Sequence, residues 1–272
     1  MDNELIMSIL TGLLVFVGLA QVLILIHQKR QNQLVLLQEY RNRWNEYQRQ
    51  WAITIFIGRT DDDYYQVAAK NLHLELMGLV EEYSLREPTT WALEAIRCVS
   101  NTLSDICTRI LQGQLEISDV YPLFGSELLR HSRPLRILLD VYYPKEHAPY
   151  EDHSHKNIRR ELQDWLIYHD GIRRRCLILI DLLWAEAARL EDLAPSDIGD
   201  AANAKIYSGK QSRKRLINEI QKINNAPSLF RVIKLTLHLK NSEFKKYKWQ
   251  VGIRRSELEE REKKWTDMLT RK

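Results

Sequence analysis

Four histidines and three acidic residues lie close together in the chain, and such side chains can bind a metal ion. They are His147, His153, His155, His169, Glu151, Asp152 and Asp170. A His-x-His pair can place both imidazoles on one side of an extended strand, an arrangement that suits zinc or nickel. The segment from Lys145 to His155 is polar and rich in turn-forming residues, however, and no second ligand pair follows at a standard spacing. We therefore predict an exposed polar loop and no metal site.

The adjacent His169 and Asp170 resemble the paired core of metal-dependent phosphohydrolases with a His-Asp signature. That family also uses an upstream histidine and a downstream aspartate, and only a loose choice of His131 and Asp181 would supply them. No nucleophile-elbow sequence supports Ser-His-Asp catalysis. We expect no catalytic residue and no cofactor, and we predict that the protein is not an enzyme.

Basic residues are concentrated near the C-terminus. Residues 205–272 contain 19 Lys+Arg and 7 Asp+Glu, a net of +12, whereas residues 1–204 contain 21 and 29, a net of −8; together they give the +4 of the whole chain. Such cations can bind nucleic acid by releasing its counterions, or meet anionic lipid, or form a solvated surface with no specific ligand. The candidate residues for an anionic ligand are Lys210, Arg213, Lys214, Arg215, Lys245, Lys246, Lys248, Arg254 and Arg255.

The expected order of elements in this basic region is that of a winged helix, which inserts its second helix into a DNA groove. The helices are predicted at Ser196–Ala204 and Gln211–Asn224. A β-hairpin should follow, because apolar and polar residues alternate over Val232–Lys240 and again over Tyr247–Ile253. A helix over 228–240 is the alternative for the first of these two segments. A capping box then predicts a last helix over residues 256–272.

An uncharged run at the N-terminus is the element that should position everything after it. As a helix, the 22 residues from Leu5 to Ile26 reach about 33 Å, the thickness of a bilayer core. The start is acidic and the run continues beyond Gly18 and Ala20, which argues against a cleaved signal peptide. Lys and Arg follow the run but do not precede it, so the positive-inside rule predicts that the N-terminus lies outside and the large domain in the cytoplasm.

Two patterns could bring copies of this N-terminal region together. Within the apolar run, Ser8 and Gly12 form a small-xxx-small pair and Gln21 is polar, and both features favour association of helices in lipid. After the run, five apolar or aromatic residues are spaced 3, 4, 3, 4 on a helix continuous with the anchor, which is typical of a coiled-coil seam over two heptads. The alternative is that this stripe packs on the rest of its own domain. Its members are Leu37, Tyr40, Trp44, Tyr47 and Trp51.

The soluble part is predicted to be mainly α-helical, because Gly and Pro are sparse and helix-forming residues dominate. One helix is expected from Asp61 to Tyr83, a second helix should end near Gly113, and a third should run from Lys156 to Leu193 with a break at Asp170-Gly171. Three cysteines, Cys98, Cys107 and Cys176, have no metal-ligand spacing, so we interpret them as reduced core thiols. The predicted organisation is an extracytoplasmic tip over residues 1–4, a transmembrane helix over 5–26, a helical domain over 27–193, and a small basic α+β region over 194–272.

Part of the helical region resembles an uncharacterised bacterial family. The resemblance lies within residues 20–145 and is carried by Arg97–Leu103, Ile110–Leu115, Tyr121–Gly125 and Arg133-Pro134. Members of that family are short, membrane-anchored and all-helical, and some occur in antiviral defence loci. The resemblance implies a tethered sensor or effector in a bacterial inner membrane and carries over no catalytic residue.

These observations predict a single-pass, membrane-anchored helical interaction module with membrane lipid around its anchor. Its other partner would be a second copy of itself or another protein. The alternative is a membrane-tethered protein that binds nucleic acid through the basic C-terminal region.

Overall fold

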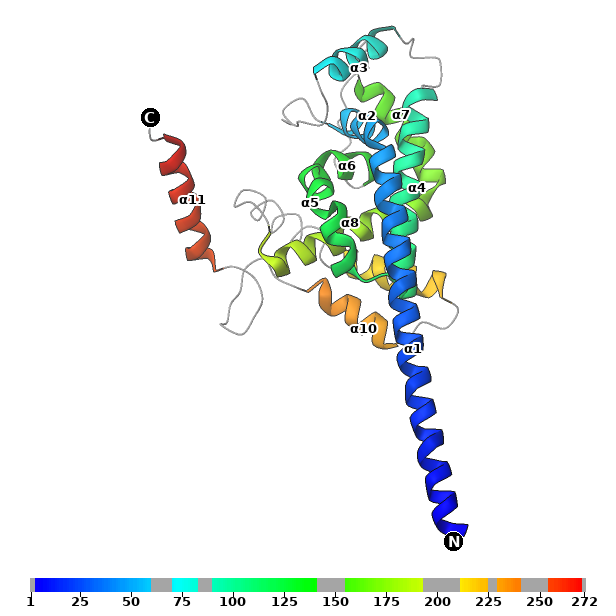
Figure 1. Cartoon of the computed structure of the whole chain (residues 1–272). Helices are drawn as coiled ribbons and strands as arrows, with labels where there is room; N and C mark the ends of the chain where they lie inside the picture. The colour runs from blue at the N-terminus through cyan, green and yellow to red at the C-terminus, as the bar shows by residue number, and fades with distance from the viewer. Residues whose placement is uncertain are drawn as a thin grey trace. The chain divides into compact units, whose positions relative to one another are not determined.

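The computed structural model describes residues 3–59, 70–82, 90–140, 155–192, 211–224, 229–240 and 254–270 (Figure 1). In these ranges every regular element is a helix, and no strand is present. The predicted mainly helical class is confirmed for this part of the chain. The chain divides into two units, Met1–Arg43 and Trp44–Lys272.

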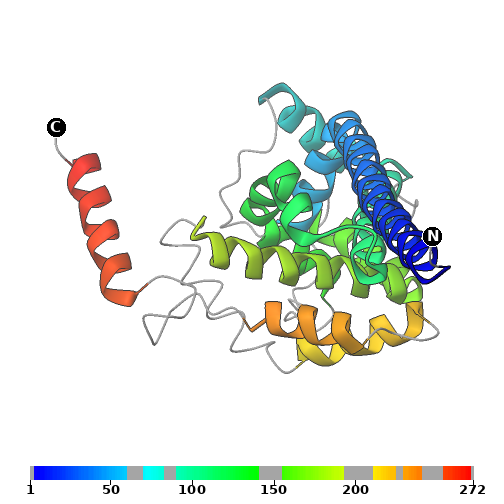
Figure 2. The same ribbon diagram turned by 60° about the horizontal axis from the view of Figure 1, so that its bottom comes forward.

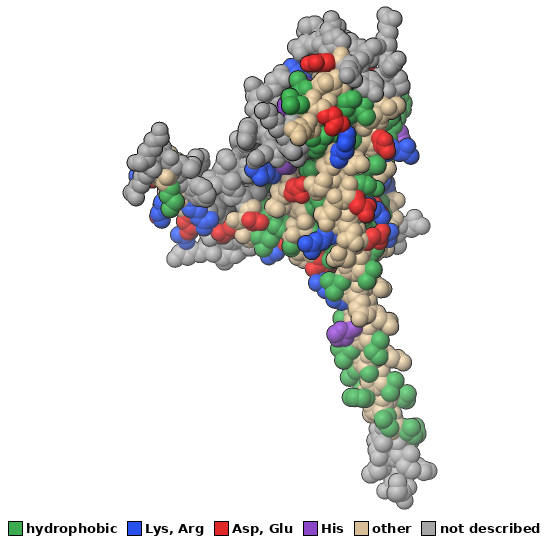
Figure 3. Space-filling view, turned by 45° about the horizontal axis from the view of Figure 1, so that its top comes forward, with side chains coloured by type: hydrophobic (Ala, Val, Ile, Leu, Met, Phe, Trp, Pro, Cys, Tyr) green, Lys and Arg blue, Asp and Glu red, His purple; other side chains and the backbone are tan. Residues whose placement is uncertain are grey.

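The first unit is almost entirely helix α1 (Asn3–Glu46), which ends three residues into the second unit. Among the described residues, α1 is the one helix long and apolar enough to cross a bilayer, over the stretch Leu10–Glu46. Between Leu10 and Ile26 its large apolar side chains are exposed and point outward on all sides. Figure 3 shows hydrophobic side chains along this part of α1, with no charged side chain among them. A helix that is apolar all round needs an apolar environment.

The second unit is a helical bundle built around two buried helices. Helix α2 (Gln48–Gly58) is buried at every position from Trp51 to Gly58 and packs against α4, α6 and α7. Helix α8 (Asp170–Leu190) is buried over most of its length and packs against α4, α5, α6 and α7. The remaining described helices of the bundle are α3 (Lys70–Glu82), α4 (Thr90–Gln112), α5 (Ile117–Arg130), α6 (Ser132–Leu139) and α7 (His155–Tyr168).

Several helix ends fall where local chemistry predicts them. Helix α4 ends before Gly113, whose φ of +86° is a conformation that glycine adopts without strain. Helices α7 and α8 are separated at His169, next to the predicted break at Asp170-Gly171. The three cysteines are free, with Cys107 and Cys176 buried, as expected of core thiols, and Cys98 half-buried. Burial raises the pKa of the Cys176 thiol to about 12, so this thiol is protonated at neutral pH.

The predicted hairpin is wrong in its first strand. Residues Leu229–His238 form helix α10, as the alternative helical interpretation had it, and the described basic region contains no strand. The alternating leucines fit a strand, but they also fit this helix. Leu235 and Leu239 are four residues apart and point inward. Leu237 lies about 200° around the helix from Leu235 and points outward. The segments Ser196–Ala204 and Tyr247–Ile253 lie outside the described residues.

Two further helices of the basic region are close to their predicted positions. One covers residues 211–223, within the predicted Gln211–Asn224. The other, α11 (Arg255–Thr270), corresponds to the predicted last helix. Helix α10 lies along α8 (Figure 2).

The close approach of α2 and α6 gives a test of the core. A Cβ atom at Gly58 would lie 2.3 Å from the Pro134 carbonyl oxygen, and this backbone contact cannot relax by turning a side chain. We expect Gly58→Ala to lower the free energy of unfolding by about 1–3 kcal/mol. Urea unfolding of the full-length protein in detergent, followed by circular dichroism, measures this.

Gly78→Ala is the matched control, because a Cβ atom at Gly78 in α3 meets nothing within 4 Å. This substitution should be neutral or stabilise the protein by about 0.5–1 kcal/mol, since alanine favours the helix. Equal stability of the Gly58→Ala variant and the wild type would contradict the tight α2–α6 contact.

Candidate functional site

The residues proposed for association within the apolar run lie on an unobstructed helix surface in the first unit. A Cβ atom at Gly12 would meet nothing within 4 Å, and Gln21 is exposed. Ser8 is helical, but its side chain lies outside the described residues. The neighbouring Thr11 hydroxyl donates to the Met7 carbonyl at 2.8 Å. This internal bond satisfies a polar group that would find no water inside a bilayer.

The aromatic stripe divides between the two units. Tyr47 is the residue between α1 and α2, with ψ of 16°, so the stripe does not lie on one unbroken helix. Leu37 and Tyr40 belong to the first unit, where the Arg43 guanidinium lies 5.7 Å from the centre of the Tyr40 ring. Tyr47 itself is half-buried.

Trp44 and Trp51 are packed inside the second unit. Their ring centroids are 4.9 Å apart, and the Trp44 ring also stacks on Phe124 at 5.2 Å. The Trp44 indole N–H donates to the Glu127 carboxylate at 3.0 Å. These two residues therefore pack on their own domain, which is the alternative that the sequence left open.

The histidines considered for metal binding make structural contacts. His131 is buried against Trp51, donates through Nδ1 to the Glu127 carbonyl at 3.1 Å, and has its pKa lowered by burial. His169 stacks on Trp165 with ring centroids 4.1 Å apart. His155 does not lie in an exposed loop as predicted: it begins α7 and is buried.

In the part of the chain that is described, no group of three His, Cys, Asp or Glu side chains is placed to hold a metal ion. His147, Glu151, Asp152 and His153 lie outside the described residues.

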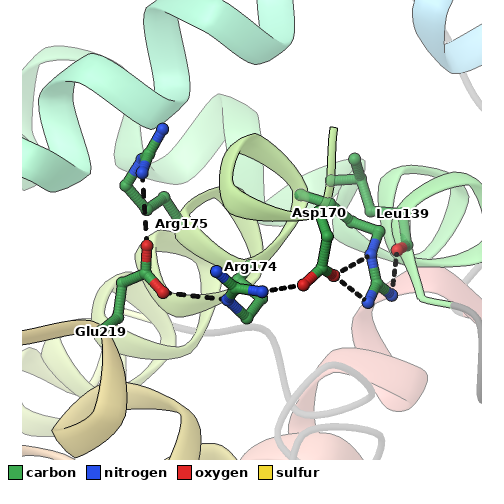
Figure 4. A network of polar contacts seen from close by, with 6 residues as sticks. Leu139, Asp170, Arg174, Arg175 and Glu219 are labelled. Carbon is green, nitrogen blue, oxygen red and sulfur yellow. Dashed lines mark hydrogen bonds and ion pairs between the residues drawn. The ribbon is translucent and has the colours of Figure 1, made fainter. Parts of the chain in front are cut away.

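A network of ion pairs surrounds the start of α8, and the sequence did not single it out as a site (Figure 4). Glu219, from the 211–223 helix, accepts from Arg174 Nε at 2.9 Å and from Arg175 Nη1 at 3.2 Å, and its side chain is only 2% exposed. Asp170 pairs with Arg174, and its carboxylate also accepts from Arg173 Nη2 at 2.5 Å. Three arginines near the positive end of a helix would repel its dipole, so Asp170 and Glu219 stabilise this end of α8.

The network extends into the core and across to α6. Arg175 Nε donates to the Ser104 hydroxyl of α4 at 2.7 Å, and Arg173 Nη1 donates to the Leu139 carbonyl at 3.2 Å. Nearby, Arg136 of α6 pairs with Asp181 of α8 at 2.5 Å, with both side chains largely buried. These contacts fix helices to one another and pair the charges within the chain.

The predicted anion-binding residues are placed in different environments. Arg215 lies 4.0 Å from Asp140, with both side chains mostly buried, whereas Lys214 is exposed and Arg213 is half-buried. The same helix buries Leu216, Glu219 and Ile220 against the bundle. Arg254 is exposed and Arg255 begins α11. Lys210, Lys245, Lys246 and Lys248 lie outside the described residues. The described candidates therefore lie in two separate segments of the chain and differ in exposure.

The C-terminal end of α4 is capped by a cation from α10. Arg231 donates through Nε to the Ile110 carbonyl at 2.9 Å and through Nη2 to the carbonyls of Ile110 and Leu115, the latter at 3.2 Å. Lys234 pairs with Glu116 at 2.8 Å. The last carbonyls of a helix have no partner within the helix ladder, and this end carries a partial negative charge. A guanidinium can donate hydrogen bonds to such carbonyls and offset the charge. Part of the basic charge near the C-terminus is thus used inside the protein.

No family model matches this chain, and comparisons with the curated proteins and with the solved structures found no significant match.

Replacing Glu219 tests the network. Glu219→Gln keeps the shape of the side chain but leaves Arg174 and Arg175 without their shared carboxylate, so we expect the free energy of unfolding to fall by about 3 kcal/mol. Denaturant unfolding of the full-length protein measures this.

Glu260→Gln is the control, since Glu260 pairs with Lys264 at 2.8 Å on the exposed surface of α11. Exposed pairs add little, and we expect no measurable change. If both variants were as stable as the wild type, Glu219 would not hold the 211–223 helix to α8.

Proposed function

We propose that this protein is a single-pass membrane-anchored interaction module with its helical domain in the bacterial cytoplasm and its N-terminus outside. The observation that carries the proposal is the apolar part of α1, whose side chains have no packing face in the protein. Exposing so many large apolar side chains to water is unfavourable, and a bilayer removes that cost.

A binding role is supported by how the conspicuous ionisable side chains are used. Asp170, Arg174, Arg175 and Glu219 pair with one another, and Arg231 caps a helix. Groups engaged in this way hold a scaffold together. We infer a function in which the anchored bundle presents surfaces to partners, as a sensor or effector of the kind that the resemblance over residues 20–145 implies, with antiviral defence as the proposed context.

Self-association through the anchor is part of this proposal. Gly12 offers close backbone approach on a surface with open space beside it, and Gln21 offers an amide that can donate and accept between helices. Neither feature has a contact partner among the described residues of one chain. A second copy in the same membrane would supply matching partners.

Charged substitutions in the middle of α1 test the anchor. Val15→Arg combined with Leu19→Arg places two guanidinium groups at the centre of the apolar run, at a cost of about 2.5–3.5 kcal/mol each in a membrane. We expect the wild type to remain in the membrane pellet after an alkaline carbonate wash and the double variant to be largely lost from it.

Leu34→Arg with Val35→Arg is the control, since these exposed residues lie on the same helix beyond the uncharged run. This variant should remain in the pellet. Intact wild-type protein in the supernatant without detergent would overturn the proposal.

Gly12→Leu tests self-association. Energy transfer between two labelled populations of the full-length protein in vesicles should show a dimerisation constant weakened about fivefold or more, since a leucine holds two backbones apart. Ala20→Leu is the control, because Ala20 is also small but lies about 80° from Gly12 and about 100° from Gln21 around the helix. Equal weakening by both substitutions would exclude a specific interface at Gly12.

A further inference from the structure

Helix α10 has an exposed apolar face that the bundle does not cover. It consists of Leu229, Phe230, Ile233 and Leu237, whose exposed fractions are 79%, 77%, 56% and 55%. At 100° per residue these four side chains fall within an arc of about 100°. We refer to these four residues as the α10 apolar face.

The opposite side of α10 is fixed to the bundle. Leu235 and Leu239 are buried, Arg231 caps α4, and His238 Nε2 donates to the Leu182 carbonyl of α8 at 3.1 Å. Lys234 is bound to Glu116 at the edge between the two sides. Because these contacts hold the helix on one side, α10 cannot roll over to bury its apolar face. The apolar face is therefore held outward.

We propose that the α10 apolar face inserts into the interfacial layer of an anionic membrane, a second lipid contact that rests on the proposed membrane anchorage. A helix of this kind lies in the plane of the membrane, with leucine and phenylalanine in the acyl boundary and cations at the headgroups. The ten residues of α10 form a cylinder about 15 Å long, enough to lay the four side chains down together.

Charge around the α10 apolar face favours lipid as the occupant. Among the cations of residues 229–248, Arg231 and Lys234 are bound to the bundle, Lys245, Lys246 and Lys248 lie outside the described residues, and Lys240 is exposed. Lys240 lies two residues after the end of α10. Lys222 is also exposed, and its neighbour Asn224 donates to the Leu111 carbonyl at 3.4 Å, at the end of α4 that Arg231 caps. Cations beside an apolar stripe match the anionic headgroups of a cytoplasmic leaflet.

The size of the α10 apolar face also favours lipid over a protein partner. A stable protein–protein interface takes about 20–30 residues on each side, and this face offers four large side chains. Membrane insertion needs no matching surface. In a chain already tethered to the bilayer, the second contact is intramolecular, so a weak affinity is sufficient.

The test uses full-length protein reconstituted into phosphatidylcholine vesicles with or without phosphatidylglycerol. In a Cys98→Ser background, which leaves two buried cysteines, an environment-sensitive fluorophore is attached at Ile233→Cys. Leu74→Cys on α3 is the control, since Leu74 is 59% exposed and Ile233 56%. With phosphatidylglycerol present, quenching by the neutral quencher acrylamide should fall about threefold or more at position 233 and stay unchanged at 74.

A second variant separates insertion from folding. Phe230→Ser with Leu237→Ser removes half of the α10 apolar face and leaves Arg231, Lys234 and His238 in place. With the label at position 233, this variant should regain the quenching seen without phosphatidylglycerol.

Each other outcome overturns the inference. Labels at positions 233 and 74 that are quenched alike in all vesicles would show that the face stays in water. Shielding at 233 that rises with protein density and not with phosphatidylglycerol would show that protein covers it. The anchor is tested separately by flotation. If the protein floats with vesicles and position 233 is not shielded, only this inference is wrong. If the protein does not float, both the anchor and this inference are wrong.

Discussion

The carboxylate of Glu219 lies between two arginines at the start of a buried helix, and the arrangement of the second unit depends on this contact. Helix α8 carries Arg173, Arg174 and Arg175 in its first turns, where the helix dipole is already positive. Asp170 balances part of this charge from within the helix, and Glu219 supplies the rest from 44 and 45 residues further along the chain. Burying these cations without Glu219 would be costly, so the 211–223 helix must pack against α8.

The same reasoning explains why the charge of the C-terminal region differs from the charge that it presents to solvent. Arg215 pairs with Asp140, and Arg231 donates to the carbonyls at the end of α4. A net charge counted along the sequence includes these cations, although they are largely satisfied by groups of the same chain. Exposed cations such as Lys214, Lys222 and Lys240 are the ones available to an anionic partner.

The sequence predicts those features that depend on local chemistry. The apolar run, the end of α4 at Gly113 and the break beside Asp170 all follow from residue types at neighbouring positions, and the structure contains each of them. Helix α10 was ambiguous because Leu235, Leu237 and Leu239 satisfy a period of two, while Leu229, Ile233 and Leu237 satisfy a helical one. Only the packing of Leu235 and Leu239 against the bundle decides between them.

The candidate surfaces were harder to predict for the same reason. The sequence shows that Glu219 is an acid in a basic region, but its partners are arginines of another helix. The spacing of the aromatic stripe predicts an apolar face but does not say whether this face packs on a second copy or on its own domain. For Trp44 the answer comes from its contacts with Phe124 and Glu127, which are distant in sequence. The spacing of residues along one sequence does not show which side chains of different helices will pair.

The cap on α4 has a consequence for the order in which the protein matures. Arg231 follows Ile110 by 121 residues and Leu115 by 116 residues. At ordinary synthesis rates this interval corresponds to on the order of 10 s on the ribosome. During that time the Ile110 carbonyl has the Gly113 N–H as a local donor but lacks the guanidinium, while the N-terminal apolar run has long since emerged. On the proposed anchorage, engagement with the lipid therefore comes before closure of the bundle, and the nascent chain would complete its final helix contacts while already held at the bilayer.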